Sequence, residues 1–126
     1  RIEENEFADV VTQALATLFP QDPPRFMART PHGHYDLRAW DRELSAAGFL
    51  APVAETIAAR SVAPRASDVA MAYCQGTPLR SEIEARGGAL EEATRVCAQA
   101  IEERFGPGPV DGKIQAHVVT AERGAA

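Results

Sequence analysis

LAPVAETIAARSV, residues 50–62, is the stretch of sequence that decides the fold. It is rich in valine, isoleucine and threonine, and its side chains alternate in the way that is typical of a β-strand. Pro52 cannot donate a backbone hydrogen bond, so we expect it at a strand edge or a bulge. A second strand is predicted at residues 113–121, where Ile114 and Val118 share one face. Two strands alone are marginal in water, so they need helices packed on them.

Helical patterns fill the rest of the sequence. Apolar residues recur at steps of three and four, which predicts amphipathic helices, and turn-forming prolines and glycines separate them. The expected helices lie at residues 4–18, 37–47, 67–75, 79–85 and 90–105. The chain in isolation is therefore predicted to be α+β, with about five helices packed on an antiparallel strand pair.

Composition and charge exclude several classes of partner. The chain has 126 residues, 45% hydrophobic and 25% charged, which is the balance of one globular domain. Its formal net charge of −5 argues against electrostatic binding of nucleic acid and against a polybasic membrane anchor. No apolar run approaches the roughly 18 residues that span a bilayer. We therefore expect neither a nucleic-acid partner nor a membrane partner.

The two cysteines predict a reducing compartment. Cys74 and Cys97 are too few for a disulfide framework, and both fall within expected helices. A buried cysteine usually packs as a small hydrophobic residue. We expect both side chains in the core of a cytoplasmic protein.

His-Gly-His-Tyr-Asp, residues 32–36, is the most distinctive polar cluster. It resembles the opening of the His-x-His-x-Asp-His metal motif of metallo-hydrolases. The motif fails at Leu37, where a further histidine is needed, and His117 is the one other imidazole in the sequence. We therefore predict no metal site. In the simpler interpretation, Asp36 caps the following helix and the rings contact a ligand or solvent.

The sequence holds no recognisable nucleotide-binding glycine loop. Residues 106–112, GPGPVDG, are glycine-rich, but prolines stand where backbone N–H donors are needed. A strand follows this stretch, whereas a phosphate-binding loop leads into a helix. The stretch is interpreted as a connector, and no residue of the chain is assigned to cofactor binding.

Six short segments, taken in order, carry a family resemblance. They are RIEENEFADVV at residues 1–11, DPPRF at 22–26, RTPHG at 29–33, LSAAGF at 44–49, GTPL at 76–79 and DGKIQA at 111–116. The ordered set resembles class I S-adenosylmethionine-dependent methyltransferases, most closely their bacterial small-molecule branch of the ubiquinone and menaquinone type. The fold of that family is a seven-stranded Rossmann-like sheet, in which strand seven lies antiparallel between strands five and six.

The resemblance implies that residues 1–126 are the C-terminal, substrate-side portion of such a domain, an α/β fragment. Residues 50–62 would be strand six and residues 113–121 strand seven, and the N-terminal cofactor-binding half would be absent. The start at Arg1, where a gene product would have Met, agrees with this expectation. S-adenosylmethionine would bind the full-length protein and not this chain, which we expect to be inactive alone.

The resemblance also implies which side chains line the pocket for a small-molecule substrate: Phe26, His32, Tyr35 and Tyr73. No catalytic residue is assigned, because methyl transfer in many relatives rests on proximity and orientation. His32 or His34 could serve as a base if the substrate must lose a proton.

Two other functions stay open. A self-contained, non-catalytic α+β binding or dimerisation domain has the same elements, and a metal-dependent hydrolase would use His32 and His34.

Under the methyltransferase interpretation, the strand at residues 113–121 lacks strand five as a neighbour. Open strand edges recruit other strands, so we expect a homodimer through this edge.

Overall fold

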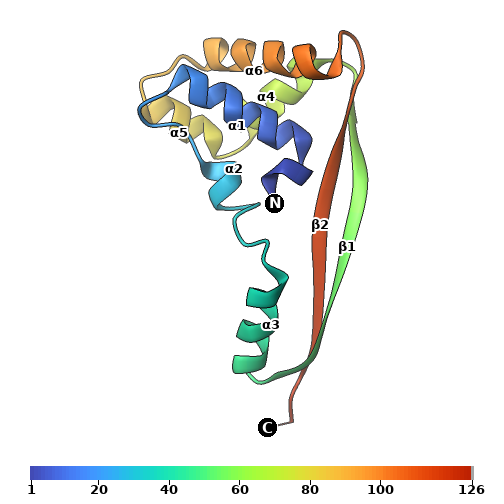
Figure 1. Ribbon diagram of the computed structural model, residues 1–126. Coiled ribbons are helices and arrows are strands. Elements are labelled where there is room, and N and C mark those ends of the chain that lie inside the picture. The colour runs from blue at the N-terminus through green and yellow to red at the C-terminus, as the bar shows by residue number, and fades with distance from the viewer. Residues whose placement is uncertain (126) are drawn as a thin grey trace.

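The two predicted strands pair with each other in the computed structural model, which describes residues 1–125 (Figure 1). In chain order, the elements are the 3-10 helix η1 (Ile2–Glu4), α1 (Glu6–Leu18), α2 (Phe26–Arg29), α3 (Leu37–Ala46), β1 (Phe49–Ala63), α4 (Ala66–Gly76), α5 (Leu79–Ala85), α6 (Leu90–Phe105) and β2 (Val110–Arg123). Over these residues the α+β class is confirmed, with six α-helices and a two-stranded antiparallel sheet. The five predicted helices are present, and the four-residue helix α2 is additional.

β1 and β2 form a long ribbon with one irregularity near its far end. The register shifts between Leu50 and Val53. Pro52 lies in this interval, which agrees with the prediction of a strand edge or a bulge at this residue. The physical cause of the irregularity is the missing N–H of proline, which cannot take part in the ladder. Ala51, just before it, has a positive φ of 46°.

β2 begins at Val110, three positions before the Lys113 predicted from the alternation of side chains, so the end of the glycine-rich connector belongs to the sheet. Val110 is fully buried. Gly112 lies against the ring of Phe7 in α1. The space is so small that a Cβ atom built on this glycine would be 3.1 Å from the ring. Packing against α1 therefore extends the strand into a segment whose local sequence indicates a connector.

Helices α1, α4, α5 and α6 build the hydrophobic core. The largest fully buried side chains on these helices are Phe7, Val11, Leu15, Cys74, Leu79, Ile83, Cys97 and Ile101. Burying such side chains is the main favourable term in folding, at about 1.5–3 kcal/mol for each large one. Among the described residues, no helix combines the length and the apolar character needed to cross a membrane.

The two cysteines belong to this core, as predicted. Cys74 lies on α4 and Cys97 on α6, and both are free thiols with 0% exposure. The Cys97 sulfur lies 3.9 Å from the carbonyl oxygen of Val11 in α1. Both side chains therefore act as small apolar residues where three helices meet.

The helical core packs beside one half of the ribbon, and α3 stands beside the other half (Figure 1). The Asp36 carboxylate caps α3 by accepting the backbone N–H of Arg38 at 2.9 Å, and Gly48 follows the helix with a φ of +84°. Both features are as the sequence predicts. No residue of α3 is fully buried. Val53, Ile57 and Val118 of the ribbon stay exposed, at 64%, 45% and 45%.

The N-terminal residues cap part of the outer edge of β2. The backbone N–H of Lys113 donates to the Glu6 carboxylate at 2.6 Å, and that of Gln115 donates to the side-chain oxygen of Asn5 at 3.0 Å. Alternate N–H groups of a paired strand point to the same edge, so His117 and Val119 present the next outward N–H groups. Within residues 1–125, no side chain caps these two groups.

Candidate functional site

A pocket of about 470 Å³ lies between the loop at residues 31–36, the N-terminus and β2, and we call it the aromatic pocket. Two of the predicted substrate-lining residues, His32 and Tyr35, line it. The other lining residues are Arg1, Asn5, Pro31, His34, Trp40, Gln115, Ala116, His117 and Val119. The pocket is therefore built from three segments that are far apart in the sequence.

The first wall is the contact between His34 and Trp40. The two rings meet edge to face, with centroids 4.5 Å apart and planes at 71°. The indole N–H of Trp40 donates to the backbone carbonyl of His34 at 3.0 Å, which closes the loop onto the first turns of α3. The Nε2 atom of His34 lies 3.5 Å from the Glu43 carboxylate on the same helix. Because α3 carries both partners of His34, the helix sets the orientation of this imidazole.

The second wall is Tyr35, which is 43% exposed at the mouth of the pocket. The guanidinium carbon of Arg1 lies 5.3 Å from the centroid of the tyrosine ring. This separation is within the range of a cation–π contact, which contributes about 0.5–1 kcal/mol at exposed sites. The N-terminal residue and the loop therefore contact each other directly.

The third wall is the face of β2 that carries Gln115 and His117. His117 pairs with Thr56 in the ladder, and its Nδ1 atom lies 2.9 Å from the threonine hydroxyl. The backbone of Gln115 is held by the side chain of Asn5 at 3.0 Å. The His117 ring and the Gln115 backbone are thus held by contacts outside their own strand.

His32 has the most perturbed environment of the imidazoles. Its side chain is half-buried, and burial, aided by the positive charge of the N-terminus, lowers the pKa of His32 below its ordinary value of 6.5. A lowered pKa keeps the ring neutral at pH 7, and a neutral imidazole offers one acceptor nitrogen. His32 can therefore accept a proton from a bound molecule, in the manner of a general base.

The pocket offers aromatic faces, neutral hydrogen-bonding groups and an arginine. These features suit a small, partly planar molecule that carries hydrogen-bonding substituents. Among the described residues, no group of three or more histidine, cysteine or acidic side chains is placed to hold a metal ion. The hydrolase interpretation based on His32 and His34 therefore gains no support from the geometry.

The other two predicted lining residues lie elsewhere. Phe26 is in α2, where it packs half-buried against the hydrophobic core. Tyr73 is in α4 and also packs against the core, and burial raises the pKa of Tyr73. Neither residue lines the aromatic pocket, so of the four predicted residues the structure brings together His32 and Tyr35.

Sequence reasoning did not assign Trp40, Gln115 or His117 to the site. The last two had a usable signal, because they alternate within the predicted strand at residues 113–121 and so share a face. Trp40 had a weaker signal, since its helical spacing also fits a residue that packs against its own protein. The juxtaposition of these residues with the loop depends on tertiary structure.

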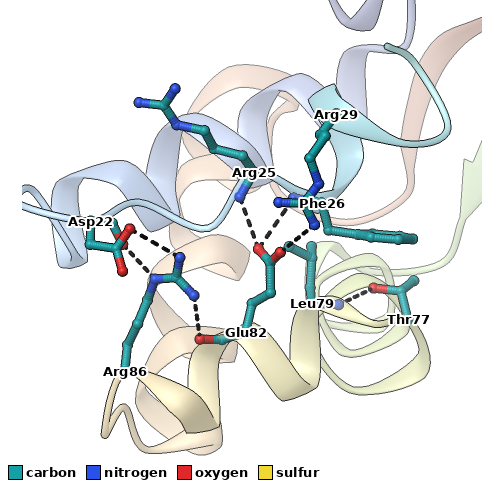
Figure 2. Close-up of polar contacts among 8 residues, drawn as sticks. All are labelled: Asp22, Arg25, Phe26, Arg29, Thr77, Leu79, Glu82 and Arg86. Atoms are coloured by element: carbon teal, nitrogen blue, oxygen red, sulfur yellow. Dashed lines mark hydrogen bonds and ion pairs between the residues drawn. The ribbon is translucent and has the colours of Figure 1, made fainter. Parts of the chain in front are cut away.

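A second polar constellation joins α2 to α5, and Figure 2 shows it. The Glu82 carboxylate accepts the backbone N–H of Arg25 at 2.9 Å, the backbone N–H of Phe26 at 3.2 Å and the guanidinium of Arg29 at 2.8 Å. We call this set of contacts the Glu82 clasp. The Arg86 guanidinium extends it by donating to the carbonyl of Glu82 at 2.8 Å and to the Asp22 carboxylate at 3.2 Å.

Partial burial of Glu82 opposes its ionisation, but the bonds from Arg29, Arg25 and Phe26 outweigh burial and lower the pKa of Glu82. The clasp is therefore an ionic one at neutral pH. It ties together segments more than 50 positions apart in the sequence.

Comparison with models of known protein families, with curated proteins and with solved structures finds no match to this chain.

Proposed function

We propose that this chain is the C-terminal, substrate-side part of an S-adenosylmethionine-dependent methyltransferase that acts on a small molecule. The observation that carries the proposal is the aromatic pocket, where His32 and Tyr35 meet His117 of β2. The α+β architecture and the antiparallel order of β1 and β2 support it, because strands six and seven of the resembled family pair in this way. The two free cysteines support a place in the cytoplasm.

The one glycine-rich stretch that leads into β2 does not have the form of a phosphate-binding loop. The stretch, residues 106–112, runs into β2, and Gly112 lies against the ring of Phe7. This stretch therefore has no cradle of backbone N–H groups in front of a helix, which a nucleotide-like group requires. The role proposed for the chain is to bind and orient the methyl acceptor, with His32 as the base if the acceptor must lose a proton.

The encoding gene provides the first test. The proposal expects the translated sequence upstream of Arg1 to contain a glycine-rich strand–loop–helix followed by further strands. A start codon directly before Arg1 would refute it.

The second test uses the full-length protein with labelled S-adenosylmethionine and a panel of small aromatic acceptors. The variant Tyr35→Ala should raise KM for the acceptor and leave cofactor binding unchanged. Tyr73→Phe, outside the pocket, is the matched control. Equal effects of the two substitutions would exclude the aromatic pocket as the acceptor site.

A non-catalytic binding or dimerisation domain is the second candidate, and the exposed ribbon favours it. Val53, Ile57 and Val118 are 45% exposed or more, and the outward N–H groups of His117 and Val119 carry no side-chain cap within residues 1–125. An open edge of this kind pairs readily with another strand. For this second candidate, we propose that two copies of the chain associate through the edge of β2. A partner strand paired there would take the place of a molecule in the aromatic pocket, because His117 and Val119 also line that pocket.

A further inference from the structure

α2 connects the Glu82 clasp to the loop at residues 31–36, which lines one side of the aromatic pocket. The backbone N–H of His32 donates to the carbonyl of Met27 in α2 at 3.1 Å. Gly33 packs so closely on the end of the helix that a Cβ atom built there would be 2.1 Å from the carbonyl oxygen of Arg29. The loop therefore cannot keep its position if α2 shifts, because backbone atoms of the two segments are in direct contact.

The same loop holds the sole tryptophan of the chain. The carbonyl of His34 accepts the indole N–H of Trp40 at 3.0 Å, and the two rings are in edge-to-face contact. Contacts thus run without a break from Glu82 to α2, from α2 to His32 and Gly33, and from His34 to Trp40. Glu82 itself does not line the aromatic pocket.

We propose that Glu82 is a positioning residue of the aromatic pocket, which fixes the loop at residues 31–36 through α2. The expected effect of Glu82 on acceptor binding rests on the proposed function. Its role in fixing the loop does not. A carboxylate is suited to the role because it accepts the two N–H groups at the start of α2 and the Arg29 guanidinium at once. α2 has four residues and no side-chain cap of its own, so it depends on this distant acceptor.

The clasp should weaken on acidification. The charged group that contacts the carboxylate is the Arg29 guanidinium of α2. Arg86, directly after α5, bonds the backbone carbonyl of Glu82 and the Asp22 carboxylate. The pKa of Glu82 is lower in the folded chain than its ordinary value of 4.5. The contribution of the clasp is therefore complete above pH 4.5, and it is lost as the pH falls through the lowered folded pKa.

Trp40 fluorescence tests the inference without any assay of methyl transfer. In the variant Glu82→Gln at pH 7, we expect the emission to shift to longer wavelength and acrylamide quenching to increase, with the far-UV circular dichroism retained. The wild type should approach the variant as the pH falls below 4.5, and this part of the pH profile should be missing from the variant. Glu84→Gln is the matched control, because Glu84 pairs with Arg80 alone, at 3.3 Å on the same helix.

Four outcomes decide whether Glu82 positions the loop. Identical Trp40 emission and quenching in Glu82→Gln and wild type would overturn the inference. If Glu82→Gln unfolds, the milder variant Arg29→Gln takes its place, because it removes only one of the three bonds to the carboxylate. We expect a small shift of its Trp40 emission to longer wavelength. An unchanged emission would again overturn the inference. In the full-length protein, Glu82→Gln should raise KM for the acceptor more than it lowers kcat. A Trp40 shift in a protein without methyltransferase activity would leave the positioning role standing and refute the proposed function instead.

Discussion

Ile83 illustrates how far stability depends on single core side chains. It is fully buried on α5, next to the helix turn that carries Glu82. Ile83→Ala removes buried methyl and methylene groups and leaves a cavity, so we expect a loss of about 2–5 kcal/mol in the free energy of unfolding. Val62→Ala is the control, since Val62 is 66% exposed and its truncation should cost within about 0.5 kcal/mol.

Urea denaturation measures both changes at residue scale. The midpoint should fall for Ile83→Ala with an unchanged m-value, which reports the surface exposed on unfolding. Equal midpoints for the two variants would show that the core does not close around α5 as described.

Residue-scale features with a local cause could be predicted from the sequence. Asp36 caps α3 and Gly48 follows the helix with a positive φ because each acts on its immediate neighbours. Glu82 had no such signal, since its partners lie at Arg25, Phe26 and Arg29. A carboxylate that caps a distant helix looks, in the sequence, like any exposed acidic residue.

At the scale of elements, the packing of α4 on α6 determines how the two cysteines react. The neighbouring Cys74 thiol and burial both raise the pKa of the Cys97 thiol, whereas the hydrogen bond with Cys97 lowers the pKa of Cys74. Both side chains are fully buried, and a thiol that a reagent cannot reach does not react whatever its pKa. We therefore expect a disulfide reagent such as Ellman's to modify neither cysteine in the native chain, and to modify both in denaturant.

A hydrogen bond between α4 and α6 provides a variant that tests the same prediction. Gln75, beside Cys74, bonds through its side-chain amide to the Thr94 hydroxyl of α6 at 3.2 Å. Gln75→Ala removes this bond and should speed the native reaction modestly by increasing local opening. Rapid labelling of the unchanged native chain would contradict the buried position of the thiols.

Element positions were largely predictable, and their limits less so. The helix at Leu90–Phe105 has the predicted bounds because a regular apolar stripe defines it. β2 starts early because Val110 is buried in the core and Gly112 packs on Phe7 of α1, a cause outside the local sequence. The candidate site follows the same rule: His32 and Tyr35 are close in sequence, whereas His117 reaches them through the fold.

At the scale of the whole molecule, the exposed edge of β2 predicts self-association. Light scattering after size-exclusion chromatography should show a mass that rises with protein concentration towards that of a dimer. Val119→Pro should hold the chain monomeric, because it removes an outward-facing N–H and spares the bonds to β1. Val119→Ala is the control and should behave as the wild type. A wild-type chain that is monomeric at every concentration contradicts the proposed dimer.

The ribbon also has a consequence for the order of folding. β1 ends at Ala63 and β2 begins at Val110, with α4, α5 and α6 between them. The strands of a hairpin pair first next to their turn, but β1 and β2 are not joined by a turn. The entropy lost on closing the long segment between them opposes their first contact. Contacts between residues distant in sequence slow folding. We therefore expect α4, α5 and α6 to pack against one another first, which brings Ala63 and Val110 close together. The strands then pair last, starting at Ala63 and Val110 and proceeding away from the helices.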